Sequence, residues 1–152
     1  MAPAPSAALN DAARALISSA NLAHVVTLNK DGSPQVSCVW VGFDTVTDAG
    51  IPDEICFASL GEYQKIKNLR RDPRITVSIE TGEEPNEYGL IPYLVINGTA
   101  RITEGHGPAM LQHLAHTYLG PDTTYPPMPD PPEGFVVRIT PTKVSGVGNW
   151  SA

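Results

Sequence analysis

The most informative stretch of the sequence is residues 65–74, which read Lys65-Ile66-Lys67-Asn68-Leu69-Arg70-Arg71-Asp72-Pro73-Arg74. The stretch holds five of the ten lysine and arginine residues and one acid, which gives it a charge of +4. The other 142 residues hold five basic residues and fifteen acids, a charge of −10. This contrast indicates a binding segment for a phosphate or carboxylate. By charge count alone, a solvated helix face explains it equally well.

A helix is predicted over residues 61–71. Ser59 and Glu62 have the spacing of a capping box, which marks a helix start. The helix ends at Asp72-Pro73, because the residue before a proline is pushed out of helical geometry. Free N–H groups at the helix start would also favour an anion near Ser59 or Lys65.

Strands and short helices follow one another on both sides of this segment. Asp31-Gly32 lies between two runs rich in β-branched residues, a strong hairpin signal. Asn97-Gly98 indicates a bulge or turn within a long strand. The predicted strands are residues 23–28, 35–41, 54–59, 74–80, 92–103 and 135–147, and the predicted helices are residues 7–20, 61–71 and 108–119. This order favours a mainly β fold, an antiparallel barrel with helices at its ends or sides.

The composition limits the class of protein. A chain of 152 residues with 15 prolines and 13 glycines fits one turn-rich domain, residues 1–152. The net charge of −6 argues against a nucleic-acid binder. No apolar run is long enough to span a membrane, and residues 1–6 lack the pattern of a secretory signal, so a cytoplasmic location is expected. The GxGxxG and GxxxxGK[ST] nucleotide-binding motifs are missing.

The reactive side chains do not form a catalytic motif. Cys38 and Cys56 lie in apolar runs and are predicted to be buried thiols. His113 and His116 have a spacing that can bind a metal, but without a nearby third ligand a surface or half-buried position is favoured, and no metal site is predicted. Because no nucleophile has a paired base, any chemistry must come from a cofactor. Trp150 is equally consistent with a core position and with stacking on a flat heterocycle or a partner subunit.

Four segments carry a family resemblance: residues 23–28 with 31–37, residues 65–74, residues 95–102 and residues 146–150. In order and across nearly the whole chain they resemble the flavin- and deazaflavin-dependent split-barrel proteins of the pyridoxamine-5'-phosphate-oxidase-like superfamily. The resemblance is to its coenzyme F420-dependent branch in particular. The pattern Lys-x-x-Asn-Leu-x-x-Asp-Pro is the most specific of the four.

The resemblance implies a six-stranded antiparallel split β-barrel that forms a homodimer with two cofactor sites at the subunit interface. Its implied cofactor-binding residues come from the second strand, the third strand, the basic helix and the C-terminus. They are Gln35, Ser37, Val39, Ala58, Ser59, Lys65, Asn68, Arg70, Arg71 and Trp150. Trp150 would cover the ring from the partner chain. No catalytic residue is assigned, and Tyr63 and Tyr93 are proton donors by residue type only.

The implied function is an F420-dependent oxidoreductase that transfers a hydride between the deazaflavin and a small conjugated or quinone-like acceptor. The anionic tail of F420 suits the +4 segment. Two alternatives stay open: an FMN-dependent oxidase or reductase, and a non-catalytic carrier of F420 or flavin. The proline-rich residues 125–132 are predicted to be either a lid over the site or a stiff loop.

Overall fold

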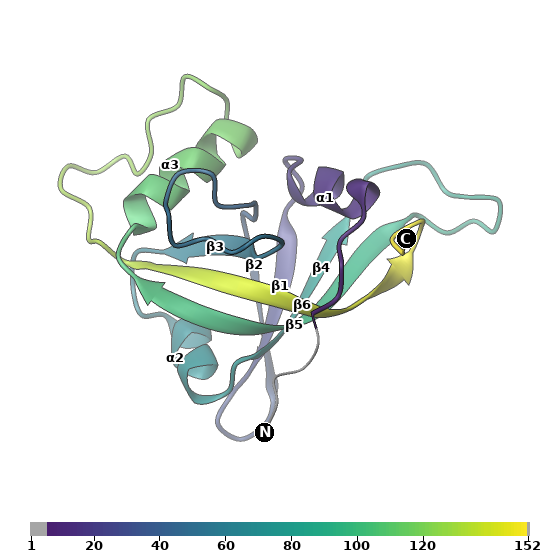
Figure 1. Ribbon diagram of the computed structural model, residues 1–152, viewed down its shortest axis with the longest axis horizontal. Helices are drawn as coiled ribbons and strands as arrows, with labels where there is room; N and C mark the ends of the chain where they lie inside the picture. Colours follow the sequence, from purple (N-terminus) through teal and green to yellow (C-terminus); the bar gives the residue numbers. More distant parts are fainter. Residues whose placement is uncertain (1–5, 152) are drawn as a thin grey trace.

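The computed structural model describes residues 6–151, and its centre is one six-stranded antiparallel sheet. The strand order is β2-β1-β4-β5-β6-β3. The strands are β1 (Ala23–Leu28), β2 (Pro34–Val39), β3 (Ile55–Ser59), β4 (Arg74–Glu80), β5 (Tyr93–Glu104) and β6 (Phe135–Val147). The sheet curves into a half-barrel (Figure 1), which confirms the predicted fold class and all six strands. Residues 1–5, which were part of the prediction on secretion, lie outside the described residues.

Three short helices complete the fold: α1 (Asp11–Ile17), α2 (Gln64–Arg71) and α3 (Gly107–Tyr118). In the view of Figure 1, α1 and α3 lie above the strands and α2 lies below them. The helices bury their apolar faces against the sheet, with Ile17, Ile66 and Leu114 almost inaccessible to solvent. The helices therefore close the core that one curved sheet leaves open.

Both of the first two helices are shorter than predicted. The helix α1 begins after Asn10, whose side chain accepts a hydrogen bond from the Ala13 N–H. The capping box before α2 is wrong. Ser59 belongs to strand β3, its hydroxyl donates to the Gly61 carbonyl, and the helix starts after Tyr63 without a side-chain cap. Pairing of Ser59 with Phe135 in the neighbouring strand outweighs the local capping pattern.

The predicted irregularity at Asn97-Gly98 is a register shift between β5 and β6. A side chain at Gly98 would have no room, since a Cβ there would lie 2.7 Å from the Thr140 carbonyl oxygen. The close approach lets β5 bend while it stays paired with β6, and a bulge of this kind is how a long strand follows the curve of a barrel.

A buried ion pair fixes the long connection between β2 and β3. Arg138 of β6 is fully buried, and its guanidinium donates to the Asp44 carboxylate at 2.7 Å and to the Thr103 hydroxyl at 3.1 Å. Burial raises the pKa of Asp44, but hydrogen bonds from Thr47 and Arg138 outweigh it and lower that pKa to about 2. The connection is thus held on the sheet through Asp44, because the buried guanidinium of Arg138 would be strongly unfavourable without a charged partner.

Among the described residues, no helix has both the length and the apolar character that crossing a membrane requires.

Replacing Asp44 by alanine should lower the free energy of unfolding by about 3–5 kcal/mol, because Arg138 would remain buried without its partner. Urea denaturation measures the change. Asp53→Ala is the matched control, since Asp53 pairs with Arg14 where both side chains are well exposed, and its loss should cost less than about 1 kcal/mol. Equal effects of the two substitutions would contradict the role assigned to the buried pair.

Candidate functional site

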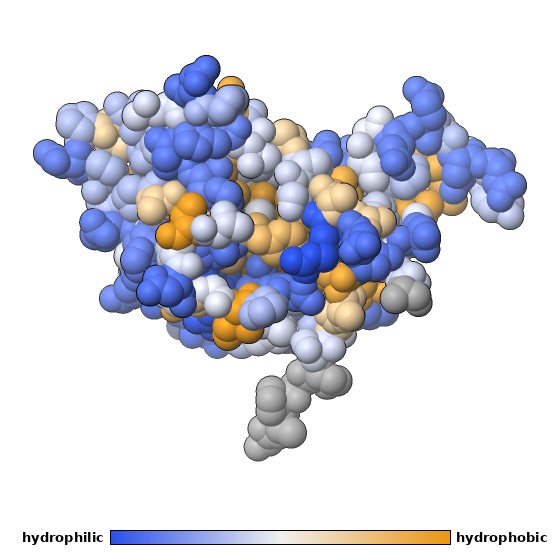
Figure 2. All heavy atoms as spheres, turned by 45° about the horizontal axis from the view of Figure 1, so that its top comes forward, coloured by the Kyte–Doolittle hydropathy of each residue, from blue (hydrophilic) through white to orange (hydrophobic). Residues whose placement is uncertain are grey.

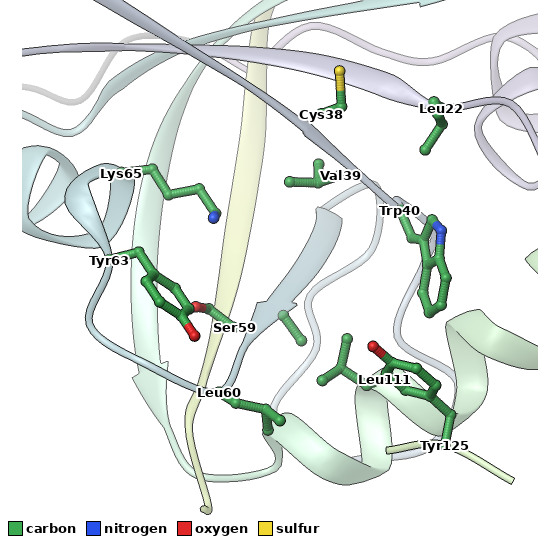
Figure 3. Close-up of a pocket in the computed structure, with 11 residues that line it drawn as sticks. Leu22, Cys38, Val39, Trp40, Ser59, Leu60, Tyr63, Lys65, Leu111 and Tyr125 are labelled. Carbon is green, nitrogen blue, oxygen red and sulfur yellow. The ribbon is translucent and has the colours of Figure 1, made fainter. Parts of the chain in front are cut away.

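A cavity of about 320 Å³ opens between β2, β3, α2 and α3 (Figure 3). This volume lies at the lower end of the range for small-molecule pockets. Its walls combine apolar and aromatic side chains with a few polar groups. They are Leu22, Cys38, Val39, Trp40, Ala58, Ser59, Leu60, Tyr63, Lys65, Leu111 and Tyr125.

One end of the cavity is cationic. Lys65 reaches from α2 towards Val39 and Ser59, and its ammonium lies 5.4 Å from the centre of the Tyr63 ring (Figure 3). Within residues 6–151 it takes part in none of the ion pairs that occupy Arg70 and Arg74. Burial lowers the pKa of Lys65 below its ordinary value. A half-buried ammonium without a carboxylate partner is a good group for holding a phosphate or carboxylate.

Asn68 sets the position of Lys65, because the two residues lie one helical turn apart. The Asn68 side chain is fully buried and donates to the Thr27 hydroxyl at 3.0 Å and to the Asn29 side-chain oxygen at 2.9 Å. Its own oxygen accepts a hydrogen bond from Gln64 at 2.8 Å. These bonds fasten α2 to the hairpin of β1 and β2, so the basic helix cannot rotate without breaking them.

The other end of the cavity is aromatic. Trp40 stacks on Tyr118 with ring centres 5.5 Å apart and meets Tyr125 edge-on at 5.2 Å. Tyr118 is fixed by its hydroxyl, which donates to the Asn21 carbonyl at 2.8 Å. Tyr125 is fixed by its N–H, which donates to the Gln112 side chain at 3.0 Å. Trp40 and Tyr125 thus form a rigid wall opposite Lys65 (Figure 3).

The proline-rich connection between α3 and β6 lies beside this cavity. Gly134 has a φ of +60°, and a Cβ there would lie 2.3 Å from the Ser59 carbonyl oxygen. Only glycine allows the connection to return so close to the end of β3. Tyr125 and Gly134 therefore fix two points of the connection against the cavity walls.

Four of the ten residues proposed from the sequence line the cavity together: Val39, Ala58, Ser59 and Lys65. Gln35 and Ser37 share a face of β2 with Val39, because alternate strand residues point to the same side. Gln35 bonds to Ser37 at 3.2 Å and accepts from the Thr27 hydroxyl at 3.1 Å.

The remaining four residues lie elsewhere in the chain. Asn68 holds the helix in place, as described above. Arg70 pairs with Glu62 at 2.6 Å, and Arg71 donates to the Leu28 carbonyl. Trp150 is 92% buried in the core of its own chain, where its indole N–H donates to the Tyr93 carbonyl at 2.8 Å. The structure does not bring these four side chains to the cavity of the same chain.

Sequence reasoning missed the aromatic wall and named Tyr63 by residue type only. Trp40 lies inside the predicted strand of residues 35–41, directly after the proposed site residue Val39, so its position was a usable signal. Tyr125 precedes the first of the clustered prolines, but nothing local shows that this segment folds back onto β2.

The two thiols differ. Cys38 is exposed beside the cavity, so the prediction that it is buried is wrong: it points to the opposite side of β2 from Val39. Cys56 is buried as predicted, and burial raises the pKa of its thiol to about 12, so it stays protonated. In residues 6–151, histidine, cysteine and acidic side chains do not gather in groups of three or more that could hold a metal ion.

Comparison with known families agrees with this geometry. The family model for pyridoxamine 5'-phosphate oxidase matches residues 9–148, nearly the entire chain. The chain belongs to this family. Membership confirms the split-barrel superfamily predicted from the four segments and places the chain among flavin- or deazaflavin-dependent oxidoreductase-like proteins. No curated protein matches the sequence.

Solved structures of related proteins share the fold. An F420 reductase is 25% identical and superimposes with a TM-score of 0.68, covering 87% of this chain and 94% of its own. A conserved hypothetical protein from Mycobacterium tuberculosis is 21% identical, with a TM-score of 0.68 and coverage of 99% and 89%. HupZ from Group A Streptococcus is 16% identical, with a TM-score of 0.60 and coverage of 93% and 96%. The last two, with their low identity, show the fold alone.

Asn68→Ala should lower the free energy of unfolding by about 1–3 kcal/mol, because Thr27 and Gln64 would lose a buried hydrogen-bond partner. Thermal or urea unfolding measures the loss. Gln112→Ala is a control that removes a partly buried amide from α3 and leaves α2 untouched. If amide exchange in α2 accelerates in the Asn68 variant and not in the control, the fastening role is supported; unchanged exchange would refute it.

Proposed function

We propose that this protein is an F420-dependent oxidoreductase that binds the cofactor in the 320 Å³ cavity and reduces a small conjugated or quinone-like acceptor. The observation that carries the proposal is the polarity of the cavity. A half-buried ammonium stands at one end and an aromatic wall at the other. Such a cavity suits an anionic cofactor held at the ammonium together with a flat acceptor against the aromatic wall.

The residues present suit the cofactor. Lys65 would hold the phosphate of the cofactor at the cationic end of the cavity. Val39 and Ala58 would bound the ring, and Ser59 would offer a hydroxyl beside it. When bound, the reduced deazaflavin supplies the hydride.

The protein's own contribution is to bind, orient and exclude water. Trp40 and Tyr125 are fixed by ring contacts and hydrogen bonds, so they would orient a flat acceptor without reorganising. Tyr63 is the nearest phenol to the cationic end and is a candidate proton donor to the reduced acceptor. The likeness to an F420 reductase at 25% identity supports this choice of cofactor.

The proposal includes a homodimer with the cofactor sites at its interface. Two apolar lining residues of the cavity, Leu22 and Tyr63, are well exposed, at 52% and 61%. A second subunit would cover these apolar groups and complete the site.

Lys65→Ala should weaken cofactor binding about 10- to 100-fold, the cost of one charge-assisted hydrogen bond. Lys67→Ala is the matched control and should have a much smaller effect, because its side chain lies in solvent where charge interactions are screened. Fluorescence titration with F420 and with FMN gives both affinities. If neither cofactor binds the wild-type protein at micromolar concentration, the proposal fails.

The same titration separates the alternatives. If the protein prefers FMN to F420 and the bound flavin reduces an acceptor, the protein is an FMN-dependent oxidase or reductase and not an F420-dependent enzyme. Tight F420 binding with no turnover across a panel of quinones and conjugated ketones would leave only a carrier.

Tyr125→Ala should raise KM for the acceptor several-fold and leave cofactor affinity close to that of the wild type, because Tyr125 stands at the end of the cavity opposite Lys65. Steady-state kinetics and fluorescence titration measure the two quantities. Met128→Ala, an exposed change in the same proline-rich segment, should alter neither. Deletion of residues 124–133 should reproduce the Tyr125 effect if the segment is a lid, and equal loss of cofactor binding and turnover would show that it is not.

A further inference from the structure

The aromatic end of the cavity holds a phenol hydroxyl that the rest of the chain leaves free. The side chain of Tyr125 points into the cavity with its hydroxyl foremost (Figure 3). Within residues 6–151 this hydroxyl takes part in no hydrogen bond, and Tyr125 bonds to Gln112 through its backbone N–H. The neighbouring phenol differs, because the Tyr118 hydroxyl donates to the Asn21 carbonyl at 2.8 Å and accepts from the Val41 N–H at 3.1 Å. Tyr125 therefore keeps a donor available where a ligand would lie.

The Tyr125 hydroxyl is held in a defined place from α3. The Gln112 side chain accepts a hydrogen bond from the Tyr125 N–H at 3.0 Å and donates one to the Thr123 carbonyl at 2.7 Å. One side chain thus holds the connection on both sides of Thr124. The Tyr125 ring also meets the Trp40 ring edge-on, with ring centres 5.2 Å apart. Because both backbone and ring are fixed, little conformational freedom is lost when a ligand bonds to the hydroxyl.

The other groups near the aromatic end offer a ligand little hydrogen bonding. The cavity lining includes three leucines, and the thiol of Cys38 is a weak donor. Trp40 carries an indole N–H, but its nitrogen lies on the edge of the ring away from Tyr125, on the side of Leu22 (Figure 3). The Tyr125 hydroxyl is thus the strong donor that this end directs into the cavity.

The charges of the lining restrict the ligand further. Lys65 is the one lining residue with a formal charge, and it stands at the opposite end. A cationic acceptor would find no carboxylate in this lining, and an anionic acceptor would compete with the cofactor for the same ammonium. The aromatic end therefore suits a neutral, flat molecule that carries a hydrogen-bond acceptor at its edge.

We propose that the Tyr125 hydroxyl donates a hydrogen bond to the carbonyl oxygen of the acceptor and thereby selects neutral, planar quinones and conjugated ketones over flat molecules without such an oxygen. The inference rests on the proposed function and names the group that recognises its substrate class. The Tyr125 ring contributes packing, and the hydroxyl contributes the choice between ligands of similar shape. A site built to bond a particular polar atom discriminates against a ligand that lacks it, since its own polar group is then left unpaired.

A matched pair of ligands isolates this hydrogen bond. Duroquinone is a flat, methylated ring with carbonyl oxygens, and durene is the same methylated ring with hydrogens in place of the oxygens. The methyl groups occupy the remaining ring carbons of duroquinone and hinder addition of the Cys38 thiol. Equilibrium dialysis measures the affinity of the protein for each ligand, with and without oxidised F420, which carries no hydride to give to the quinone.

Tyr125→Phe removes the hydroxyl and keeps the ring. It should weaken duroquinone binding about three- to tenfold, the usual worth of one neutral hydrogen bond, and leave durene binding unchanged. Tyr88→Phe is the matched control and should change neither affinity, because Tyr88 is 79% exposed in the loop of residues 81–92. This loop projects on the side of the molecule away from α3 (Figure 1), and Figure 2 shows it as a separate lobe with a hydrophilic tip. Melting curves check that both variants fold.

Three results would overturn the inference: a wild type that does not bind duroquinone, unchanged duroquinone binding in Tyr125→Phe, or equal losses for duroquinone and durene, which would leave Tyr125 a packing role only. F420 titration of the same samples tests the proposed function separately. A hydroxyl effect on duroquinone in a protein that does not bind F420 would keep this inference and refute the choice of cofactor. Tight F420 binding without any hydroxyl effect would do the reverse.

Discussion

The buried amide of Asn68 is the constraint on which the site depends. It is the one polar side chain of α2 that is inaccessible to solvent, and its donors and acceptor are spent on Thr27, Asn29 and Gln64. A buried amide left without these partners would cost more than the bonds are worth, so the helix has one allowed seating against the hairpin. The position of Lys65 follows from the way Asn68 fixes α2 against the hairpin. The motif Lys-x-x-Asn thus joins a residue that faces the cavity to one that holds the helix.

The basic segment owes its role to geometry more than to its total charge. The other three guanidinium groups are bound elsewhere: Arg70 donates to Glu62, Arg71 to the Leu28 carbonyl, and Arg74 to Asp72. What faces the cavity is the single ammonium of Lys65. Charge counting along the chain located the right helix and overstated how many of its cations share one site.

The sequence predicts the strands well because their signals are local. The Asp31-Gly32 hairpin, the alternation in residues 74–80 and the bulge at Asn97-Gly98 each need only neighbouring residues to be read. Predictions failed where a distant partner decides. Ser59 pairs with Phe135 and so belongs to a strand, and Cys38 is exposed because its side of β2 has no partner within the described chain. The aromatic wall joins residue 40 to residues 118 and 125, a contact that no local pattern encodes.

The connection from α3 to β6 is tied down at Tyr125 and at Gly134 and is exposed over most of the residues between them. Because the connection is fixed to the rest of the protein at Tyr125 and Gly134, the residues between them can change without disturbing the sheet or α2. The segment between Tyr125 and Gly134 is therefore a part of the cavity's surroundings that can be replaced independently of the rest of the fold. Over evolution or in the laboratory, that end can acquire a new preference while the opposite end stays the same.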